Sequence, residues 1–287
     1  MQRLLPPQHS KLKAENMRFL CLAVAVVGMI GAASLVVVFV RTGGSHPMFY
    51  GAWARLSMAS SATDLQLKAI IHYATSHIVP QQSRQEIGVS FDVLRSLGGS
   101  CNFLVFGLGH DSLMWSAINA RGKTLFLEED PKWVETVLKD APELRANTVR
   151  YRTQLSEADE LMRHFREEPD CSPEKSFIRG NDKCRLALNM LSDEVYDTEW
   201  DMIMVDAPRG YFDAAPGRMA AIYSVAVMAR NRNGSGDTHV FLHDVDRRVE
   251  KMYADAFFCK KFLVKAVGRL WYFRIPPAAK RSRGGFC

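Results

Sequence analysis

Short apolar runs alternate with amphipathic stretches from Asn102 onwards, and this alternation constrains the fold more than any other feature of the chain. Strands that alternate with helices form βαβ units, which build a mostly parallel sheet with helices on both faces. The chain is therefore predicted to be an α/β protein with a doubly wound sheet. The expected strands are 103–106, 124–127, 148–151, 202–205 and 239–242, and helices are expected to begin at Asp111, Pro131, Ser156, Gly217 and Asp246.

The C-terminal part of the pattern is predicted to be an antiparallel hairpin, with strands 262–266 and 269–275 on either side of Val267-Gly268. A mostly parallel, doubly wound sheet with this ending is the class I methyltransferase variety of the fold, whose methyl donor is S-adenosylmethionine (SAM). Two helices upstream are expected to cover one face of the sheet. The first follows Asp64 as its N-cap and carries Leu65, Leu67, Ile70, Ile71 and Ala74, and the second carries Ile87, Phe91 and Leu94.

The 22 residues from Phe19 to Val40 carry no charge and are predicted to form a transmembrane helix. At about 1.5 Å per residue, such a helix crosses the roughly 30 Å hydrocarbon layer of a membrane. Four basic residues precede the run and Arg41 follows it, so the positive-inside rule predicts type II topology, with the bulk of the chain in the lumen. A cleaved signal peptide is the alternative, because residues 31–34 are small, but its apolar region usually spans only about 7 to 15 residues.

The remaining chain is divided by composition into a lumenal stem at 41–62, a catalytic domain at 63–277 and a solvated basic tail at 278–287, behind a cytosolic tail at 1–18. A pI near 9.0 raises the question of nucleic acid as a partner. However, residues 1–41 and the basic tail hold eight of the 37 basic residues and one of the 31 acidic residues. The domain between them is nearly neutral, so nucleic acid is not expected as a partner.

Five of the six cysteines lie outside the expected anchor, where an oxidising lumen favours disulfides. Cys171 and Cys184 flank a polar stretch that contains Pro and Gly, and they are the best candidates for a local disulfide. The odd number leaves one thiol free or intermolecular. No Cys-x-x-Cys or His-x-x-x-His spacing indicates zinc. Asn233 begins the sequon Asn-Gly-Ser and is a candidate for glycosylation.

The turn Gly107-Leu-Gly109 joins the first strand to a helix and is a candidate ligand site. Glycines let the backbone turn tightly near a ligand, and a helix N-terminus offers free N–H groups. Ser112 stands where a dinucleotide fingerprint has its third glycine, which counts against a pyrophosphate ligand. Glu128 ends the next strand, where a carboxylate can bind ribose hydroxyls. The candidate cofactor contacts are therefore Gly107, Gly109, Asp111 and Glu128.

Two later strands also end in ionisable residues, Asp206 after 202–205 and His243-Asp244 after 239–242. The carboxyl ends of parallel strands meet at one edge of a sheet, so we expect these three side chains to surround the transferred methyl group. Either His243 or Asp206 can serve as the general base that takes a proton from a sugar hydroxyl. Asp206 and Asp244 also match the arrangement of catechol-type O-methyltransferases, in which such carboxylates hold a divalent ion, so a metal is an alternative.

Arg209, Arg218 and Arg247 follow the same strands and are candidates for binding an anionic acceptor. A guanidinium group pairs with a carboxylate through two parallel hydrogen bonds. The alternative is that these arginines are solvated surface residues without a ligand. Of the three, Arg218 is the one most strongly expected to bind the acceptor instead.

The sequence resembles the plant polysaccharide O-methyltransferases, a family that includes glucuronoxylan 4-O-methyltransferases, arabinogalactan O-methyltransferases and the irregular-xylem-fifteen proteins. The ending 268–273 is most similar to the arabinogalactan branch. The resemblance implies a Golgi membrane enzyme that methylates O4 of glucuronic acid on a wall glycan, arabinogalactan first and glucuronoxylan second, with Golgi enzyme complexes as partners. It runs from about Leu65 to Pro277 and rests on segments 72–73, 79–82, 101–115, 127–130, 196–201, 205–208, 216–219 and 243–244.

Two other classes of protein share parts of this pattern. A non-catalytic Golgi scaffold for xylan biosynthesis would keep the fold, but the intact set of Gly107, Gly109, Glu128, Asp206 and His243 argues against it. A nicotinamide-dependent oxidoreductase is disfavoured by the absent third glycine and by the closing hairpin.

Overall fold

The computed structural model describes residues 47–173, 175, 177–278 and 285–287. The chain divides into two compact units, Met1–Leu56 and Ser57–Cys287, and the second carries the α/β fold. The expected cytosolic tail, the expected membrane anchor at 19–40 and residues 41–46 of the expected stem lie outside the described residues. Among the helices that are described, none combines the length and the apolar character needed to cross a membrane.

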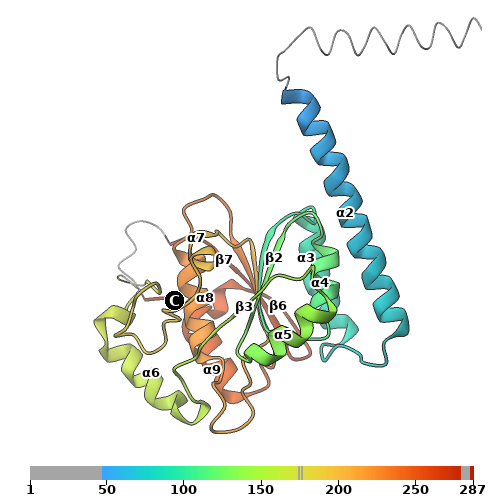
Figure 1. Cartoon of the computed structure of the whole chain (residues 1–287). Coiled ribbons are helices and arrows are strands. Elements are labelled where there is room, and N and C mark those ends of the chain that lie inside the picture. Colours follow the sequence, from blue (N-terminus) through green and yellow to red (C-terminus); the bar gives the residue numbers. More distant parts are fainter. Residues whose placement is uncertain (1–46, 174, 176, 279–284) are drawn as a thin grey trace, which may run out of the picture. The chain divides into compact units, whose positions relative to one another are not determined.

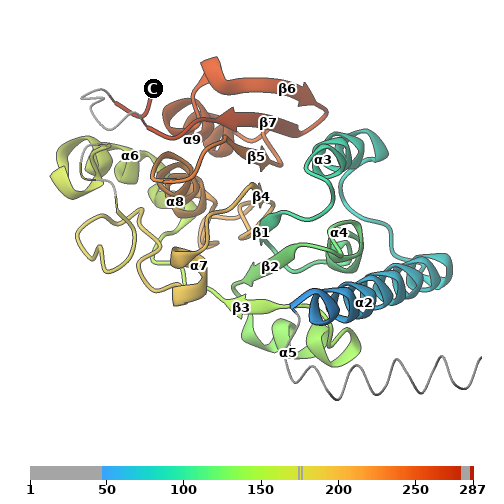
Figure 2. The same ribbon diagram turned by 90° about the horizontal axis from the view of Figure 1, so that it is seen from above.

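Within the described residues, seven strands form one mixed sheet in the order β3-β2-β1-β4-β5-β7-β6 (Figure 2). Strands β1 to β5 run parallel, and β7 lies antiparallel between β5 and β6. The expected doubly wound sheet with a closing hairpin is confirmed. The strands are β1 (Asn102–Phe106), β2 (Lys123–Glu128), β3 (Ala146–Thr148), β4 (Met202–Val205), β5 (Thr238–Leu242), β6 (Leu263–Val267) and β7 (Leu270–Ile275).

Helices cover both faces of this sheet (Figures 1 and 2). On one face lie the part of α2 (Pro47–Thr75) that belongs to the second unit, α3 (Arg84–Ser96), α4 (Ser112–Ile118) and α5 (Pro131–Asp140). On the other lie α6 (Ala158–Glu167), α7 (Asp193–Asp197), α8 (Met219–Arg230) and α9 (Arg248–Phe257). Short 3₁₀ turns occur at η1 (Leu155–Glu157), η2 (Pro169–Cys171) and η3 (Lys260–Phe262).

Alternate side chains of each central strand enter the two halves of the core. In β1, Leu104 and Phe106 pack with the α6 to α9 layer, while Phe103 and Val105 pack with the α2 to α5 layer. Burial on both faces explains why the strands appear in the sequence as continuous apolar runs. The switch in strand order between β1 and β4 opens a crevice at the carboxyl ends of these two strands, which is where such sheets bind ligands.

The third strand differs from its expected position. It pairs with β2 through Ala146–Thr148, so the expected strand at 148–151 overlaps it only at Thr148. Val149 and Tyr151 made the later segment appear strand-like, but they pack against the core after β3 has ended. Pairing, rather than the apolar pattern, sets the boundary here. The short elements α7 and η2 were not predicted either.

Helix α2 also differs, because it begins at Pro47 and Asp64 lies in its interior rather than at its N-cap. No Gly or Pro interrupts the chain between Ala52 and Thr75, so nothing in the sequence breaks the helix at Asp64. The expected apolar face is wrong in part, since Leu65 does pack against the core. Leu67, Ile70 and Ile71 are 54%, 64% and 65% exposed, and Ala69 packs against the sheet layer instead.

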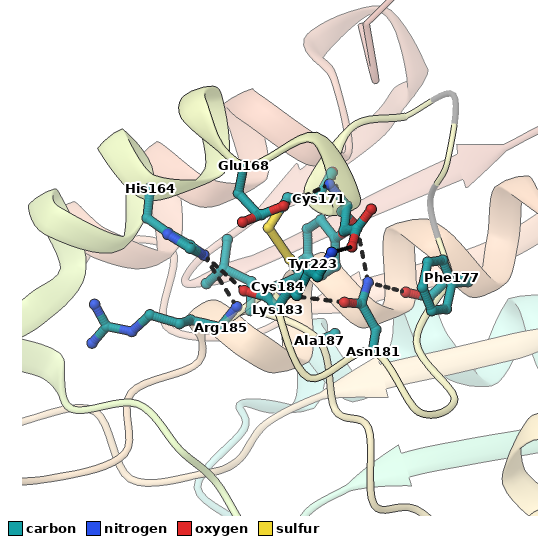
Figure 3. Close-up of a disulfide and its surroundings, with 12 residues drawn as sticks. His164, Glu168, Cys171, Phe177, Asn181, Lys183, Cys184, Arg185, Ala187 and Tyr223 are labelled. Atoms are coloured by element: carbon teal, nitrogen blue, oxygen red, sulfur yellow. Dashed lines mark hydrogen bonds and ion pairs between the residues drawn. A yellow bond between two sulfur atoms is a disulfide. The ribbon is translucent and has the colours of Figure 1, made fainter.

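The expected disulfide between Cys171 and Cys184 is confirmed. Figure 3 shows the disulfide with the side chain of Asn181 beside it, which forms hydrogen bonds to both ends of the loop that the disulfide closes. The amide of Asn181 donates to the carbonyl oxygens of Asp170 and Phe177 at 2.8 and 2.9 Å and accepts from the N–H of Cys184 at 3.0 Å. The disulfide therefore anchors a compact segment against the α8 face of the core.

A second disulfide, between Cys259 and Cys287, was not predicted. It corrects the expectation of a solvated tail for residues 285–287, because Phe286 is 3% exposed and packs on aromatic rings that include Phe257. Cys101 is the unpaired cysteine among the described residues, and burial raises the pKa of its thiol to about 12.

Candidate active site

The turn after β1 lies against the end of β4. Gly107 has φ of +120°, and a Cβ atom there would lie 3.2 Å from Cβ of Ala207, so glycine permits this close approach. The N–H of Leu108 donates to Oε2 of Glu128 at 3.0 Å, and the N–H of Gly109 donates to Oγ of Ser112 at 2.9 Å. The turn is thus fixed before any ligand binds.

Tyr73 of α2 holds the other end of the same turn. Its hydroxyl donates to the carbonyl oxygen of His110 at 2.6 Å and accepts from the N–H of Met114 at 3.1 Å. Burial raises the pKa of Tyr73 to about 12, so the hydroxyl keeps its proton at physiological pH. Sequence reasoning gave Tyr73 no role, because nothing local to α2 reveals a partner 37 residues away.

Glu128 is the last residue of β2 and lies where a ribose-binding carboxylate was expected. Besides Leu108, it accepts from the N–H groups of Glu129 and Asp130 through Oε1 at 3.0 and 3.2 Å. Burial and the charge of Glu128 raise the pKa of Glu129. A carboxylate offers about four acceptor positions, so Oε2 of Glu128 retains one for a ligand hydroxyl.

Asp206 and His243 come together because β4 and β5 are parallel neighbours. Oδ1 of Asp206 lies 2.9 Å from Nδ1 of His243 and 3.3 Å from Nη2 of Arg218, while Oδ2 accepts from Nε2 of Gln82 at 3.0 Å. Burial raises the pKa of Asp206, but the hydrogen bond with His243 and the charge of Arg218 outweigh it and hold that pKa below its usual value. Asp206 is therefore ionised at neutral pH.

The two candidate bases differ in access. The His243 side chain has no exposed surface, and its Nε2 has no hydrogen-bond partner among the described residues and lies 3.8 Å from Oε1 of Glu86. The Asp206 side chain keeps 23% of its surface exposed. Of the two, Asp206 can reach an acceptor hydroxyl, and His243 supports it from behind.

Asp244 has a different role from the one expected. Its φ is +61°, its side chain is 4% exposed, and its carboxylate pairs with Arg218, Arg247 and Arg269 at 2.9, 2.9 and 2.6 Å. A carboxylate surrounded in this way has no oxygen free to face a substrate. We therefore correct the expectation of a catalytic Asp244 to that of a buried counter-ion.

Arg218 is likewise not an acceptor-binding residue. It is 4% exposed, and its guanidinium donates to the carbonyl oxygens of Pro208, His243 and Asp206 as well as to the two aspartates. The sequence placed this arginine near the strand ends but could not show that its side chain points inward. Its position instead fixes Asp206 and Asp244 relative to each other.

The other candidate arginines are accessible. Arg209 is 53% exposed and lies 3.6 Å from Glu129, while the Arg247 side chain is 30% exposed. Arg269, which sequence reasoning missed, is 42% exposed and donates to Asp244 and to the carbonyl oxygen of Gln81. The sequence feature that could have identified Arg269 is its position just before β7. The first residues of β7 pair with the carboxyl end of β5, where the site lies.

The expected metal pair can be tested against these contacts. One donor atom each from Asp206, His243 and Asp244 lies within 4.8 Å of the others. However, Nη2 of Arg218 lies 3.3 Å from Asp206 and 2.9 Å from Asp244. A divalent ion would have to displace this guanidinium, so the arrangement does not fit a resident metal.

A cleft of about 200 Å³ opens at the carboxyl edge and brings the four candidate cofactor contacts together with Asp206. Three acidic residues, Asp111, Glu128 and Asp206, line the cleft, and the described part of its lining includes no Lys or Arg. Burial and the charge of Asp206 raise the pKa of Asp111. A ligand with cationic sulfonium and ammonium groups and with ribose hydroxyls for Glu128 fits these walls, and SAM has all three. A larger cavity of about 840 Å³ lies between α2, α3 and α4. None of the described residues that line it lies at the end of a strand, so it holds none of the candidate site residues.

Residues 85–273 match the family described as IRX15/IRX15L/GXM. The chain belongs to the IRX15/IRX15L/GXM family. Arabinogalactan O-methyltransferase 1 of Arabidopsis thaliana is 56% identical over 271 residues, which cover 92% of this chain and 93% of that protein. Glucuronoxylan 4-O-methyltransferase 2 of the same plant is 48% identical over 220 residues, which cover 76% and 74%. Protein IRREGULAR XYLEM 15 is 36% identical over 247 residues, which cover 85% and 75%.

Among solved structures, a putative caffeoyl-CoA O-methyltransferase from Staphylococcus aureus aligns with a TM-score of 0.40 and 13% identity, over 79% of this chain and 97% of that chain. Membership of the IRX15/IRX15L/GXM family, at this identity to named O-methyltransferases, makes the chain a SAM-dependent O-methyltransferase with SAM as its cofactor.

Proposed function

We propose that the chain transfers the methyl group of SAM to O4 of glucuronic acid residues on a plant cell-wall polysaccharide, with arabinogalactan as the acceptor. The observation that carries the proposal is the arrangement around Asp206. An ionised and partly exposed carboxylate borders the cofactor cleft, and accessible arginines follow the neighbouring strands. This combination pairs a base with a site for an acidic sugar.

The chemistry assigned to the chain's own residues is positioning and proton transfer. Bound in the cleft, SAM supplies a methyl carbon on a cationic sulfur. As the bond from this carbon to O4 forms and the carbon–sulfur bond breaks, the O4 proton passes to the carboxylate of Asp206. Asp206 is held for this by Gln82 on one oxygen and by His243 and Arg218 on the other. General base catalysis of this kind contributes about 10²- to 10⁴-fold to the rate.

The acidic acceptor is supported by the charge around Asp244. Arg218, Arg247 and Arg269 share the carboxylate of Asp244, while Arg218 also pairs with Asp206 and Arg247 lies 3.6 Å from Glu250. Arg247 and Arg269 keep partly exposed guanidinium groups. A uronate carboxylate can complete the pairing, because guanidinium groups bind carboxylates with well-defined geometry. Arg209 extends the positive charge along the loop after β4.

The choice of polymer rests on the relatives' names. The two arabinogalactan O-methyltransferases are 56% and 58% identical to this chain, against 48% for glucuronoxylan 4-O-methyltransferase 2. Glucuronoxylan is therefore the second candidate acceptor. The non-catalytic scaffold for xylan biosynthesis is disfavoured, because a scaffold has no need of an ionised carboxylate at an open cleft.

We propose further that the enzyme is a single-pass type II protein of the Golgi membrane, with its catalytic domain in the lumen and Golgi enzyme complexes as partners. The apolar run at 19–40 supports the membrane anchor. The two disulfides support an oxidising compartment, and Asn233 is exposed and available for glycosylation. Protease protection of the domain in intact Golgi vesicles is the expected result, and digestion without detergent would contradict this topology.

The experiment that tests the proposed activity uses the purified full-length chain, SAM with a labelled methyl group, and demethylated arabinogalactan or demethylated glucuronoxylan. We expect label to enter arabinogalactan in preference to glucuronoxylan, and to be recovered as 4-O-methylglucuronic acid after hydrolysis. A parallel reaction with chelator tests the absence of a resident metal. Transfer to neither polymer, despite measurable SAM binding, would overturn the proposed substrate.

A further inference from the structure

The loop between β4 and α8 presents two aromatic rings to solvent. Tyr211 is 68% exposed and Phe212 is 45% exposed, and the two rings meet edge to face with centroids 5.2 Å apart. Large apolar side chains that cluster at a surface mark an interaction site more often than chance exposure does. These two rings stabilise no part of the core, so their exposure calls for another explanation.

The exposure is not the result of a loose loop. The carbonyl oxygens of Asp213 and Ala215 accept from the N–H groups of Ser156 and Leu155 at 3.1 and 2.8 Å, and that of Pro216 accepts from Oγ1 of Thr153 at 2.9 Å. These bonds tie the loop to the segment before α6. The backbone that carries the rings is therefore fixed, and a fixed backbone holds an aromatic side chain ready for a ligand at a small entropic cost.

The base of the loop is fixed as tightly as its outer side. Gly210 is buried, and a Cβ atom there would lie 2.8 Å from Oε1 of Glu250, so the chain passes close to α9 at this point. The N–H of Gly217 donates to the carbonyl oxygen of Arg209 at 2.9 Å, which closes the loop on itself. Tyr211, next to Gly210, therefore has a defined position.

The loop also has the right neighbours for an acidic glycan. The loop begins directly after Asp206 and ends at Arg218, so both of its ends lie at the reacting edge of the sheet. Arg209, on the same loop, is 53% exposed, and its guanidinium lies 3.6 and 4.0 Å from the carboxylates of Glu129 and Asp130. A surface that combines two edge-to-face aromatic rings with an exposed guanidinium matches a sugar chain that carries carboxylates.

We propose that Tyr211 and Phe212 form a stacking platform for the acceptor glycan, which binds the sugar next to the uronic acid that is methylated. This inference rests on the proposed function. The apolar C–H face of a pyranose packs on the face of Tyr211, and the phenol hydroxyl stays in water or bonds a sugar hydroxyl. The platform selects a polymeric acceptor over a free monosaccharide, because only a polymer presents a neighbouring sugar.

The test measures glycan binding directly, without methyl transfer. The variants Tyr211→Ala, Phe212→Ala and Tyr211→Phe of the full-length chain are compared with wild type for binding to demethylated arabinogalactan by calorimetry. Phe177→Ala is the matched control, because Phe177 is 43% exposed and lines a cavity with Asn233 and Thr238 at the opposite edge of the sheet. SAM binding is measured for each variant to show that the site is intact.

We expect Tyr211→Ala to weaken glycan binding about tenfold, the size of one lost stacking contact, while its affinity for SAM stays that of wild type. Tyr211→Phe should keep most of the affinity, because the ring remains, and Phe177→Ala should bind as wild type. Unchanged glycan affinity in Tyr211→Ala would overturn the platform. Wild-type protein that binds the glycan through Tyr211 but does not methylate it would support the platform and contradict the proposed function instead.

Discussion

The carboxylate of Asp206 and the imidazole of His243 form a hydrogen-bonded pair, with Oδ1 and Nδ1 2.9 Å apart, and His243 has no exposed side-chain surface. The pair joins the ends of β4 and β5, but only its Asp206 member borders the cleft. His243 therefore acts through Asp206, by fixing the direction of its carboxylate. Arg218 has the same effect from the other side, since it bonds the backbone of both residues.

Replacement of Asp206 by Asn keeps the shape of the side chain but removes the base. We expect kcat to fall by about 10²- to 10⁴-fold, the usual contribution of a general base, while SAM binding persists. Initial rates and calorimetry with SAM are the measurements. Asn233→Gln, at the opposite edge of the sheet, should retain wild-type activity. An Asp206→Asn enzyme that transfers methyl groups at the wild-type rate would refute the site.

The strands that carry the site were predictable from the sequence, because parallel buried strands produce apolar runs that end where polar residues begin. The expected strand 202–205 coincides with β4, and the expected meeting of Asp206, His243 and Asp244 is confirmed by donor atoms within 4.8 Å. This follows from parallel topology alone, since the carboxyl ends of such strands share one edge.

The direction of each side chain was not predictable in the same way. A polar residue just after a strand can point into the cleft, as Asp206 does, or into a buried ion cluster, as Asp244 does, and the sequence pattern is the same for both. The prediction that Leu67, Ile70 and Ile71 are buried was wrong for a related reason. Their spacing marks one face of a helix but does not show what that face contacts, and in the structure it is exposed. The position of Arg269 at the site could not be predicted either, because it depends on the pairing of β7 with β5, which is a non-local contact.

Arg269 is expected to bind the acceptor's carboxylate. In Arg269→Gln, KM for a glucuronic acid acceptor should rise by about tenfold, because the variant loses the binding energy of one charge-assisted hydrogen bond. The effect on kcat should be smaller. Steady-state kinetics with arabinogalactan oligosaccharides measure both. Arg274→Gln is the matched control, because Arg274 lies near the far end of β7, the strand that Arg269 precedes, and pairs with Asp237. Equal KM values for the two variants would contradict the assignment.

Glu250 is expected to destabilise the fold at neutral pH. Its side chain has no exposed surface, its two oxygens have no hydrogen-bond partner among the described residues, and burial raises its pKa. A carboxyl group whose folded-state pKa is raised favours folding while it is protonated, and this advantage is lost as the pH rises above the unfolded-state pKa of about 4.3. Glu250→Gln mimics the protonated form at every pH.

The Glu250→Gln variant should therefore be more stable than wild type at pH 7, with Tm higher by about 2 to 4 °C if it gains about 1 kcal/mol. The difference should shrink as the pH falls towards 4, which thermal unfolding across this range would show. A difference in Tm that does not change with pH would mean that Glu250 does not titrate as its burial requires. Glu250 lies 3.6 Å from Arg247, which also pairs with Asp244 at 2.9 Å, so Arg247→Gln is measured in parallel to bound the effect of losing both pairs.

The disulfide between Cys259 and Cys287 is expected to stabilise the domain by holding Phe286 in place. The two cysteines are 28 residues apart, and closing a loop of this length in the unfolded chain gives about 3.5 kcal/mol. Phe286 packs on Phe257 with ring centroids 5.2 Å apart, and its carbonyl oxygen accepts from Nη1 of Arg230 at 2.9 Å. Cys287→Ser should lower the free energy of unfolding by about 2 to 4 kcal/mol.

Urea unfolding without reductant measures this loss, since the bond between Cys171 and Cys184 then stays intact in every variant. Cys101→Ser is the control, because that thiol is unpaired and its replacement breaks no crosslink. Phe286→Ala should destabilise the domain by about 2 to 4 kcal/mol even with the disulfide present, because it empties a buried aromatic site. If Cys287→Ser unfolds at the same urea concentration as wild type, the end of the chain does not hold the aromatic cluster together, and the solvated tail expected from the sequence would be the better description.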